Sequence, residues 1–340
     1  MIKEAISLLV SGRSLTTEEA ASVMEEIMEG QATPAQIGAF VTALRLKGET
    51  VDEIIGLAKT MRSKAIPVTV SGPVVDTCGT GGDNLSTFNI STAAAFVAAG
   101  VGLKVAKHGG RAASSQCGSA DVLETLGVRI DLNAEQVQRC LQEIGIGFMF
   151  APVFHPAFKY ASAPRREIGI RTVFNILGPL TNPAGAKAQV LGVADESLVE
   201  KLALALQGLG CHHALVVNGE DGLDEITVSG KTHVCEVQDD CLKNYSISPE
   251  DFGLSRASLD SLRGGTTAEN AALLRNVLED VPGSQRDVVL MNAAAVLLAG
   301  DRVGTLQQGI ALAKEAVDSG QALAKLEQLI DFSQSLTKEP

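Results

Sequence analysis

Residues 75–92 of the chain, VDTCGTGGDNLSTFNIST, place three glycines between a short apolar run and an alanine-rich segment. The apolar run predicts a strand, and the segment that opens at residues 89–92 predicts a helix. Glycine tolerates positive φ and lets a ligand approach the backbone, while consecutive N–H groups and a helix N-terminus attract anions. The stretch therefore favours a phosphate-binding loop, with a plain tight turn as the alternative. It matches neither G-x-x-x-x-G-K-[ST] nor G-x-G-x-x-G, which disfavours a P-loop nucleotidase and a Rossmann dehydrogenase.

A second glycine-bearing cluster, KHGGRAASS at residues 107–115, follows the apolar run at residues 103–106. Because the carboxyl ends of parallel strands meet at one edge of an open α/β sheet, we expect this loop to lie beside the first. Two neighbouring loops with a Lys, a His and an Arg suit a diphosphate better than a single phosphate. A solvated basic turn is the alternative.

The third candidate is the acid pair Asp224 and Glu225 in the stretch GEDGLDEITVSG. Adjacent carboxylates in a loop are either surface residues or ligands that share a divalent cation. Mg²⁺ typically binds through one or two carboxylates, water and substrate phosphates. Together with two predicted phosphate loops, the pair favours a magnesium site.

Capping signals and short apolar runs organise the rest of the chain. Thr16, Thr33 and Thr50 are each followed three residues later by Glu or Gln, the spacing of a capping box, so residues 1–64 are expected to form short helices. Beyond residue 67, strand–helix alternation predicts a mostly parallel sheet, and the last three strands, with short polar links, predict an antiparallel extension. The expected strands are residues 74–76, 103–106, 146–150, 189–193, 214–217, 225–228, 233–237 and 245–247.

A proline-bounded block at residues 155–183 interrupts this alternation with a helical pattern, and its apolar positions need a partner. We expect that partner to be the N-terminal helices. The predicted fold class is α/β, with a small discontinuous helical domain and a larger α/β domain whose mostly parallel central sheet is flanked by helices. The predicted boundaries are residues 1–66 and 155–186 for the helical domain, and residues 67–154 and 187–340 for the α/β domain. We expect the ligand in the crevice between them.

The composition restricts the partners of the 340-residue chain. Its formal net charge of −12 disfavours a nucleic-acid binder. Its longest apolar runs are shorter than the roughly 20 residues of a membrane span, and its start lacks a signal-peptide pattern, so we expect a cytoplasmic protein without a membrane partner. Six widely spaced cysteines favour a reduced state. The Cys and His residues at 211–213 and 233–235 match no familiar zinc spacing, and we expect them to be structural.

Taken in chain order, the motifs resemble those of the anthranilate phosphoribosyltransferases. They are CGTGGD, NIST, KHGGRAASS, GSADVLE, PRREIG, FNILGPLTNPA and GLDE, and they extend over nearly the whole chain. The resemblance implies transfer of the phosphoribosyl group of 5-phosphoribosyl-1-diphosphate (PRPP) to the amine of anthranilate, a step of tryptophan biosynthesis. It also implies use of Mg²⁺ and a homodimer formed through the helical domain.

The site residues implied by this resemblance fall into four sets. Magnesium would be held by Ser91, Asp224 and Glu225. Anthranilate would be bound by Gly79, His108, Gly110, His155 and Arg165, with Arg165 on its carboxylate. The catalytic residues would be Lys107, His108 and Arg111, of which Lys107 and Arg111 would stabilise the departing diphosphate. PRPP would be bound by Gly79, Gly82, Asp83, Thr87, Asn89, Ile90, Ser91, Thr92, Lys107, His108, Gly109, Gly110, Arg111, Ala112, Ala113, Ser114, Ser115 and Ser119.

Gly110 departs from the family pattern, which reads KHGN where this chain reads KHGG. The backbone donors of the loop remain, but a side-chain hydrogen bond to the acceptor, typically worth about 1 kcal/mol, would be lost. Two other functions stay open. A pyrimidine nucleoside phosphorylase of the same fold would carry a Lys-His-Ser-x-Gly-Gly signature, which this chain does not match. A non-catalytic nucleic-acid-binding relative would need a basic groove.

Overall fold

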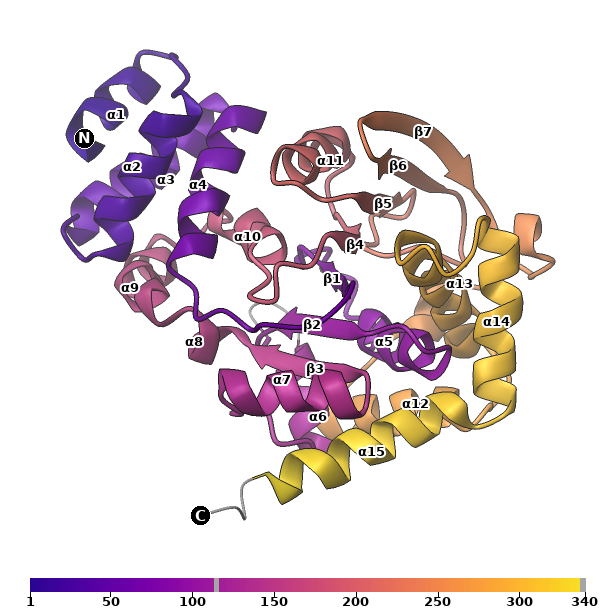
Figure 1. Cartoon of the computed structure of the whole chain (residues 1–340). Helices are drawn as coiled ribbons and strands as arrows, with labels where there is room; N and C mark the ends of the chain where they lie inside the picture. Colours follow the sequence, from indigo (N-terminus) through magenta and orange to yellow (C-terminus); the bar gives the residue numbers. More distant parts are fainter. Residues whose placement is uncertain (113–115, 337–340) are drawn as a thin grey trace.

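Seven strands form the centre of the structure, a computed structural model that describes residues 1–112 and 116–336. The strands are β1 (Val75–Gly79), β2 (Val105–Gly109), β3 (Ile146–Phe150), β4 (Ala188–Gly192), β5 (His213–Gly219), β6 (Thr232–Gln238) and β7 (Cys241–Ile247). They make one sheet in the order β3-β2-β1-β4-β5-β6-β7 (Figure 1). The strands from β3 to β5 in this order run parallel, and β6 and β7 are antiparallel. The predicted parallel sheet with an antiparallel extension is confirmed.

One expected strand, at residues 225–228, is wrong. These residues form an irregular loop between β5 and β6, although Ile226 and Val228 are fully buried. The Ile226 N–H donates to Asn292 Oδ1 at 3.0 Å, and Asn292 Nδ2 donates to the Ile226 carbonyl at 2.9 Å. A buried side-chain amide therefore satisfies backbone groups that a neighbouring strand would otherwise pair.

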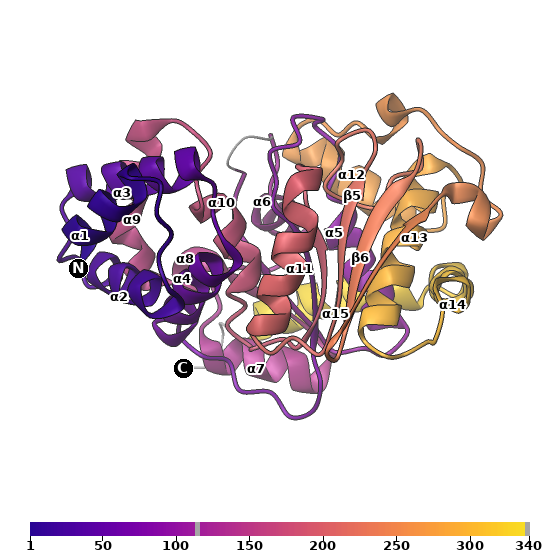
Figure 2. The ribbon, with the colours of Figure 1, turned by 90° about the horizontal axis from the view of Figure 1, so that it is seen from above.

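Helices cover both faces of the sheet. They are α5 (Ile90–Gly100), α6 (Ser119–Thr125), α7 (Ala134–Glu143), α11 (Val199–Gly208), α12 (Thr267–Leu278), α13 (Ser284–Ala299), α14 (Leu306–Asp318) and α15 (Gln321–Ser335), with 3-10 turns η3 (Glu196–Leu198), η4 (Pro249–Phe252) and η5 (Leu259–Leu262). Figure 2 shows α11 on one side of β5 and β6 and α13 on the other. Alternate strand residues point to opposite faces, so Leu215 and Val217 join the apolar core of α5 and α13, whereas Val216 joins that of α11.

The N-terminal helices begin where the capping boxes predict. They are α1 (Ile2–Val10), α2 (Thr17–Met28), α3 (Pro34–Lys47) and α4 (Val51–Ser63). Thr16, Thr33 and Thr50 each accept a hydrogen bond from the N–H three residues later, and the Glu or Gln there accepts one from the threonine N–H. Each cap satisfies donors that the helix leaves unpaired, which fixes the start of the helix.

Short helical pieces follow β3 and pack against the N-terminal helices. They are α8 (Ala151–Phe154), η1 (Pro156–Phe158), α9 (Lys159–Ile168), α10 (Phe174–Leu177) and η2 (Gly178–Leu180). α9 lies against α2 and α3, and α10 lies against α4 (Figure 1). Ala161 and Phe174 are buried in the same apolar cluster as the N-terminal helices, and this cluster continues through α11 onto the sheet. The domain boundaries at residues 66, 154 and 186 therefore stay a prediction.

Candidate active site

A cavity of about 350 Å³ lies at the carboxyl ends of the parallel strands. The loops after β1, β2 and β5 emerge at this edge because the strands run in the same direction. The two glycine-bearing loops and the acid pair therefore converge. The predicted site residues that line the cavity are Gly79, Gly82, Asp83, Thr87, Asn89, Ile90, Ser91, Thr92, Lys107, His108, Gly109, Gly110, Arg111, Ala112, Ser119, Arg165, Asp224 and Glu225. Ala113, Ser114 and Ser115 lie outside the described residues.

Asp224 is held against the first glycine loop. Its Oδ2 accepts a hydrogen bond from the Gly81 N–H at 2.6 Å. A Cβ built at Gly79 would collide with the Asp224 carboxylate, and one built at Gly192 would collide with the Asp224 carbonyl. Glycine at the ends of β1 and β4 is therefore what lets the acid loop approach the sheet.

Glu225 faces the N-terminus of α5. Its Oε1 accepts a hydrogen bond from the Ser91 N–H at 3.1 Å. The hydroxyl of Thr92, one residue further into the helix, is buried and has no hydrogen-bond partner in the part of the chain that the structure describes. A helix N-terminus carries a partial positive charge, so this corner of the cavity favours an anion.

Glu225 is buried and its neighbour Asp224 is half-buried, and neither carboxylate forms an ion pair within the described part of the chain. Burial, and next the charge of Glu225, raises the pKa of Asp224 well above its ordinary value. Burial likewise raises the pKa of Glu225 to about 7, although Lys107 opposes this effect. A nearby cation would relieve both carboxylates.

The oxygen donors present fit Mg²⁺. The described residues contain no group of three or more His, Cys, Asp or Glu side chains that could hold a metal ion on its own. Asp224, Glu225 and the Ser91 hydroxyl would therefore supply only part of a coordination shell. Mg²⁺ commonly takes the remaining oxygens from water and phosphate, which matches a site beside two phosphate loops.

Lys107 and Asp76 form a buried link beneath the glycine loops. Lys107 Nζ donates to the Thr77 carbonyl at 2.7 Å and lies 3.4 Å from Ser91 Oγ. Asp76 accepts hydrogen bonds from the N–H groups of Thr77 at 2.8 Å and His108 at 3.3 Å. Burial raises the pKa of Asp76, and the charge of Lys107 opposes that rise. The pair fixes the ends of β1 and β2 and directs the ammonium group toward the N-terminus of α5.

His108 and His155 form a buried pair with ring centroids 5.0 Å apart. Burial, and next the neighbouring His155, lowers the pKa of His108 to about 3, and burial lowers the pKa of His155 to about 4. Both rings are therefore neutral at pH 7. His108 lines the cavity, and His155 packs against His108 without lining it. A role of His155 in binding the acceptor therefore stays a prediction.

Arg111 lines the cavity, but its guanidinium is held by α6. Its Nη1 lies 2.8 Å from carboxylate oxygens of both Asp121 and Glu124. The hydrogen bonds that Arg111 donates, first to Glu124 and then to Asp121, raise its pKa. Its predicted action on a leaving group would require the guanidinium to exchange these partners, and that role stays a prediction.

Arg165 is a cation without a counter-ion within the described residues. Its guanidinium lies over the Phe158 ring at 5.8 Å. Burial, and next the charge of Arg171, lowers the pKa of Arg165. Arg171 and Asn175 also line the cavity, and neither was predicted as a site residue. The signal was present, since the basic residues cluster in one proline-bounded block.

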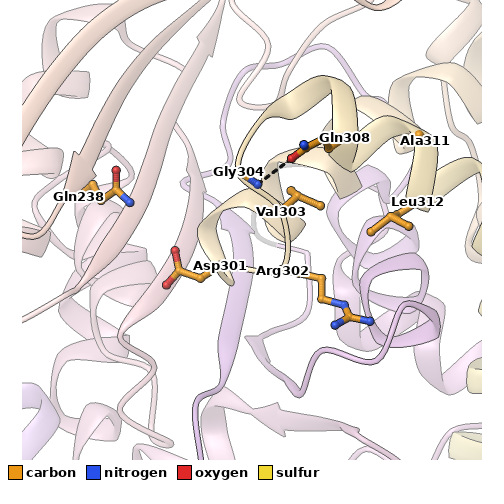
Figure 3. A pocket seen from close by; sticks show the side chains of 8 residues that line it. All are labelled: Gln238, Asp301, Arg302, Val303, Gly304, Gln308, Ala311 and Leu312. Atoms are coloured by element: carbon orange, nitrogen blue, oxygen red, sulfur yellow. Dashed lines mark hydrogen bonds between the residues drawn. The ribbon is translucent and has the colours of Figure 1, made fainter.

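A larger cavity, about 720 Å³, lies at the opposite edge of the sheet, between the end of β6 and the turn from α13 to α14 (Figure 3). Its lining contains none of the predicted site residues. Asp301 points toward Gln238, whereas Arg302 points away from both (Figure 3). Because its charged groups do not converge, its size alone does not make it the active site.

No helix within the described residues is long and apolar enough to cross a membrane.

Comparison with known proteins agrees with this geometry. Residues 71–323 match the α/β domain of a glycosyl transferase family, and residues 3–65 match the helical bundle domain of that family. The chain is 59% identical over 338 residues to the anthranilate phosphoribosyltransferase of Dehalococcoides mccartyi, covering 99% of each chain. It is 61% identical over 334 residues to that of Chloroflexus aurantiacus, covering 98% of each.

Two solved structures extend the comparison. Anthranilate phosphoribosyltransferase from Thermus thermophilus superposes with a TM-score of 0.92 at 44% identity, over 97% of this chain and 99% of that one. The enzyme from Saccharomyces cerevisiae, in complex with PRPP and Mg, superposes with a TM-score of 0.91 at 30% identity, over 98% of each chain. The chain belongs to the anthranilate phosphoribosyltransferase family.

Proposed function

We propose that the chain transfers the 5-phosphoribosyl group of PRPP to the amine of anthranilate, giving N-(5-phosphoribosyl)anthranilate and diphosphate, with Mg²⁺, in L-tryptophan biosynthesis. The observation that carries the proposal is the convergence of three features in one cavity. Two glycine-bearing loops offer backbone N–H donors. Within the described residues, Asp224 and Glu225 form no ion pair with a cation, and Arg165 forms none with an anion. A magnesium-diphosphate donor and a carboxylate-bearing acceptor supply what is missing.

On the donor side, the bond between ribose C1 and the diphosphate oxygen breaks, and the leaving group takes the electron pair. A bound Mg²⁺ would neutralise part of the negative charge on the diphosphate oxygens. The backbone donors of the first glycine loop and of the α5 N-terminus lie where that charge grows, next to the unpaired Thr92 hydroxyl. Lys107, fixed by the Thr77 carbonyl, adds a positive charge.

On the acceptor side, Arg165 would hold the carboxylate of anthranilate through two parallel hydrogen bonds. The amine would then face ribose C1, its nitrogen lone pair would form the new bond, and its proton would leave afterwards. An aromatic amine has a free lone pair, so it requires no strong base. Neutral His108, whose Nε2 is buried and unpartnered, can accept a hydrogen bond and help to orient the amine.

The proposal includes a cytoplasmic homodimer formed through the helical domain, which comprises residues 1–66 and 155–186. The support is apolar exposure on two helices that pack together: Val10 at the end of α1 is 74% exposed, and Leu46 at the end of α3 is 84% exposed. Exposed apolar surface on a monomer can mark a protein–protein contact, so we expect a partner to cover these two side chains. Light scattering on the purified chain and on Leu46→Lys would test this, and a monomeric mass for both would contradict it.

The reaction is tested by following the fluorescence of anthranilate in the presence of PRPP and Mg²⁺. We expect fluorescence to fall only when both are present and to stay constant with EDTA. A panel of substituted anthranilates would define the acceptor. Release of thymine from thymidine and phosphate, without loss of anthranilate, would instead indicate a nucleoside phosphorylase.

A further inference from the structure

Arg171 joins the helical pieces after β3 to the first glycine loop. It lies in the turn between α9 and α10, and a Cβ built at Gly82 would coincide with its Nη1. Gly82 also has φ +77, a conformation that other residues rarely adopt. A side chain at this position would displace the guanidinium, so the loop and Arg171 pack closely against one another.

Arg171 has no counter-ion or hydrogen-bond acceptor within the described part of the chain, and it is exposed. The acids of the same cavity, Asp83, Asp224 and Glu225, do not pair with it. Arg165, six residues earlier, is also unpaired and feels the charge of Arg171. Two guanidinium groups of like charge thus face one cavity from a single segment, an arrangement that anionic ligands would stabilise.

A second cavity of about 190 Å³ adjoins the first, and Thr80, Gly82, Arg171 and Asn175 line both. Thr172, a residue that is 4% exposed, lines this second cavity, and its buried hydroxyl has no hydrogen-bond partner within the described residues. Asn175 Oδ1 accepts from the Thr172 N–H at 3.0 Å, which fixes the turn that presents Arg171. The backbone of the turn is therefore held in place, whereas the Thr172 hydroxyl and the Arg171 guanidinium have no partner within the described residues.

We propose that Arg171 binds the diphosphate of the donor, while Arg165 binds the carboxylate of the acceptor, so that one helical segment contributes one arginine to each substrate. The inference rests on the proposed function and deepens it. A guanidinium beside a glycine loop can hold a phosphate group by two parallel hydrogen bonds.

The test compares Arg171→Gln with Arg165→Gln and with a matched control, Arg166→Gln, whose side chain is exposed and lines neither cavity. Calorimetry with inorganic diphosphate and Mg²⁺ gives donor-side affinity without turnover. We expect Arg171→Gln to weaken diphosphate binding at least tenfold and to raise the KM for PRPP similarly, with the KM for anthranilate within twofold. Arg165→Gln should show the reverse, and Arg166→Gln should match the parent.

Arg171→Lys keeps the charge but not the planar fork, so it should recover only part of the diphosphate affinity. Circular dichroism melts identify any variant that fails to fold. If Arg171→Gln fails to fold, the diphosphate affinity of Arg171→Lys is compared with that of the parent instead. Unchanged diphosphate binding in Arg171→Gln would overturn the inference, as would equal effects on the two substrates. If the parent itself did not bind magnesium-diphosphate, the proposed function would fail instead.

Discussion

Buried charged groups lie at both ends of the parallel strands, but they have protein counter-ions at the amino ends and none within the described residues at the carboxyl ends. At the carboxyl edge, burial raises the pKa values of Asp224 and Glu225, which form no ion pair within the described residues. At the amino edge, the buried His213 ring lies 2.7 Å from Asp301 Oδ1 and 3.1 Å from Glu236 Oε1. Both ring nitrogens face carboxylates, so the charged ring is satisfied there. A buried charged group whose partners all come from the protein indicates a structural cluster. A buried charged group without such a partner indicates a site where a ligand supplies the opposite charge.

The largest expected effect follows from replacing the acids at the carboxyl edge. Asp224→Asn combined with Glu225→Gln should lower turnover by about a hundredfold, equivalent to about 2.7 kcal/mol in the barrier, because magnesium-diphosphate loses its protein ligands. Initial rates measured against Mg²⁺ concentration check this. Near-parent rates at limiting Mg²⁺ would remove the acids from the metal site.

At the amino edge, removing the cation should destabilise the fold. His213→Gln should lower the free energy of unfolding by about 2 kcal/mol at pH 6, a value reduced because Asp301 is half exposed. Burial lowers the pKa of His213, but the hydrogen bonds of its ring with the carboxylates of Glu236 and Asp301 outweigh this effect, so the pKa is raised. Its stabilisation is therefore fully present below the usual pKa of 6.5 and is lost as the pH rises through the higher value of the folded state.

Urea unfolding of the parent and His213→Gln from pH 5.5 to 9 measures this effect. The two stability curves should approach each other at high pH. The exposed His233 provides a control, because His233→Gln should leave stability nearly unchanged. A constant difference between the parent and His213→Gln across this range would show that packing, rather than charge, explains the effect.

Stability should change in the opposite sense at the carboxyl edge. Without Mg²⁺ at pH 8, the double amide variant of Asp224 and Glu225 should be about 1 kcal/mol more stable than the parent, because it no longer holds two adjacent acids in a site that penalises their charged forms. Its amide oxygens can still accept from the N–H groups of Gly81 and Ser91. Melting temperatures with EDTA and with Mg²⁺ provide the readout. A less stable variant in EDTA would mean that the acids are structural.

The smallest expected effect is at Gly110. A Cβ at this position would meet no atom of the described residues within 4 Å, so a side chain can be introduced here. If the asparagine amide of Gly110→Asn reaches the acceptor, it should lower the KM for anthranilate about three- to fivefold, close to 1 kcal/mol, and leave the KM for PRPP unchanged. Gly110→Ala supplies the matched control, since it adds bulk without a donor. Equal effects of both substitutions would exclude a hydrogen bond.

Local chemistry made much of the fold predictable. A threonine and an acid or amide three residues later can satisfy each other only at a helix start, so the three N-terminal caps needed no distant partner. The run at residues 225–228 failed for the opposite reason. Its apolar residues are buried, but Asn292, far along the chain, decides how its backbone is bonded.

The candidate site divides in the same way. The amino-acid sequence by itself determined the chemistry: glycines where backbone must meet a ligand, an acid pair, and a basic block, each visible within a few neighbouring residues. Only the tertiary structure decided which groups are free. Arg111 is paired with acids of α6, His155 packs against His108, and Arg171 lies against Gly82. Packing brings together residues that are far apart in the sequence, and these contacts decide which charged side chains are buried and which form ion pairs. The charged groups that remain unpaired determine the charge that a ligand must carry.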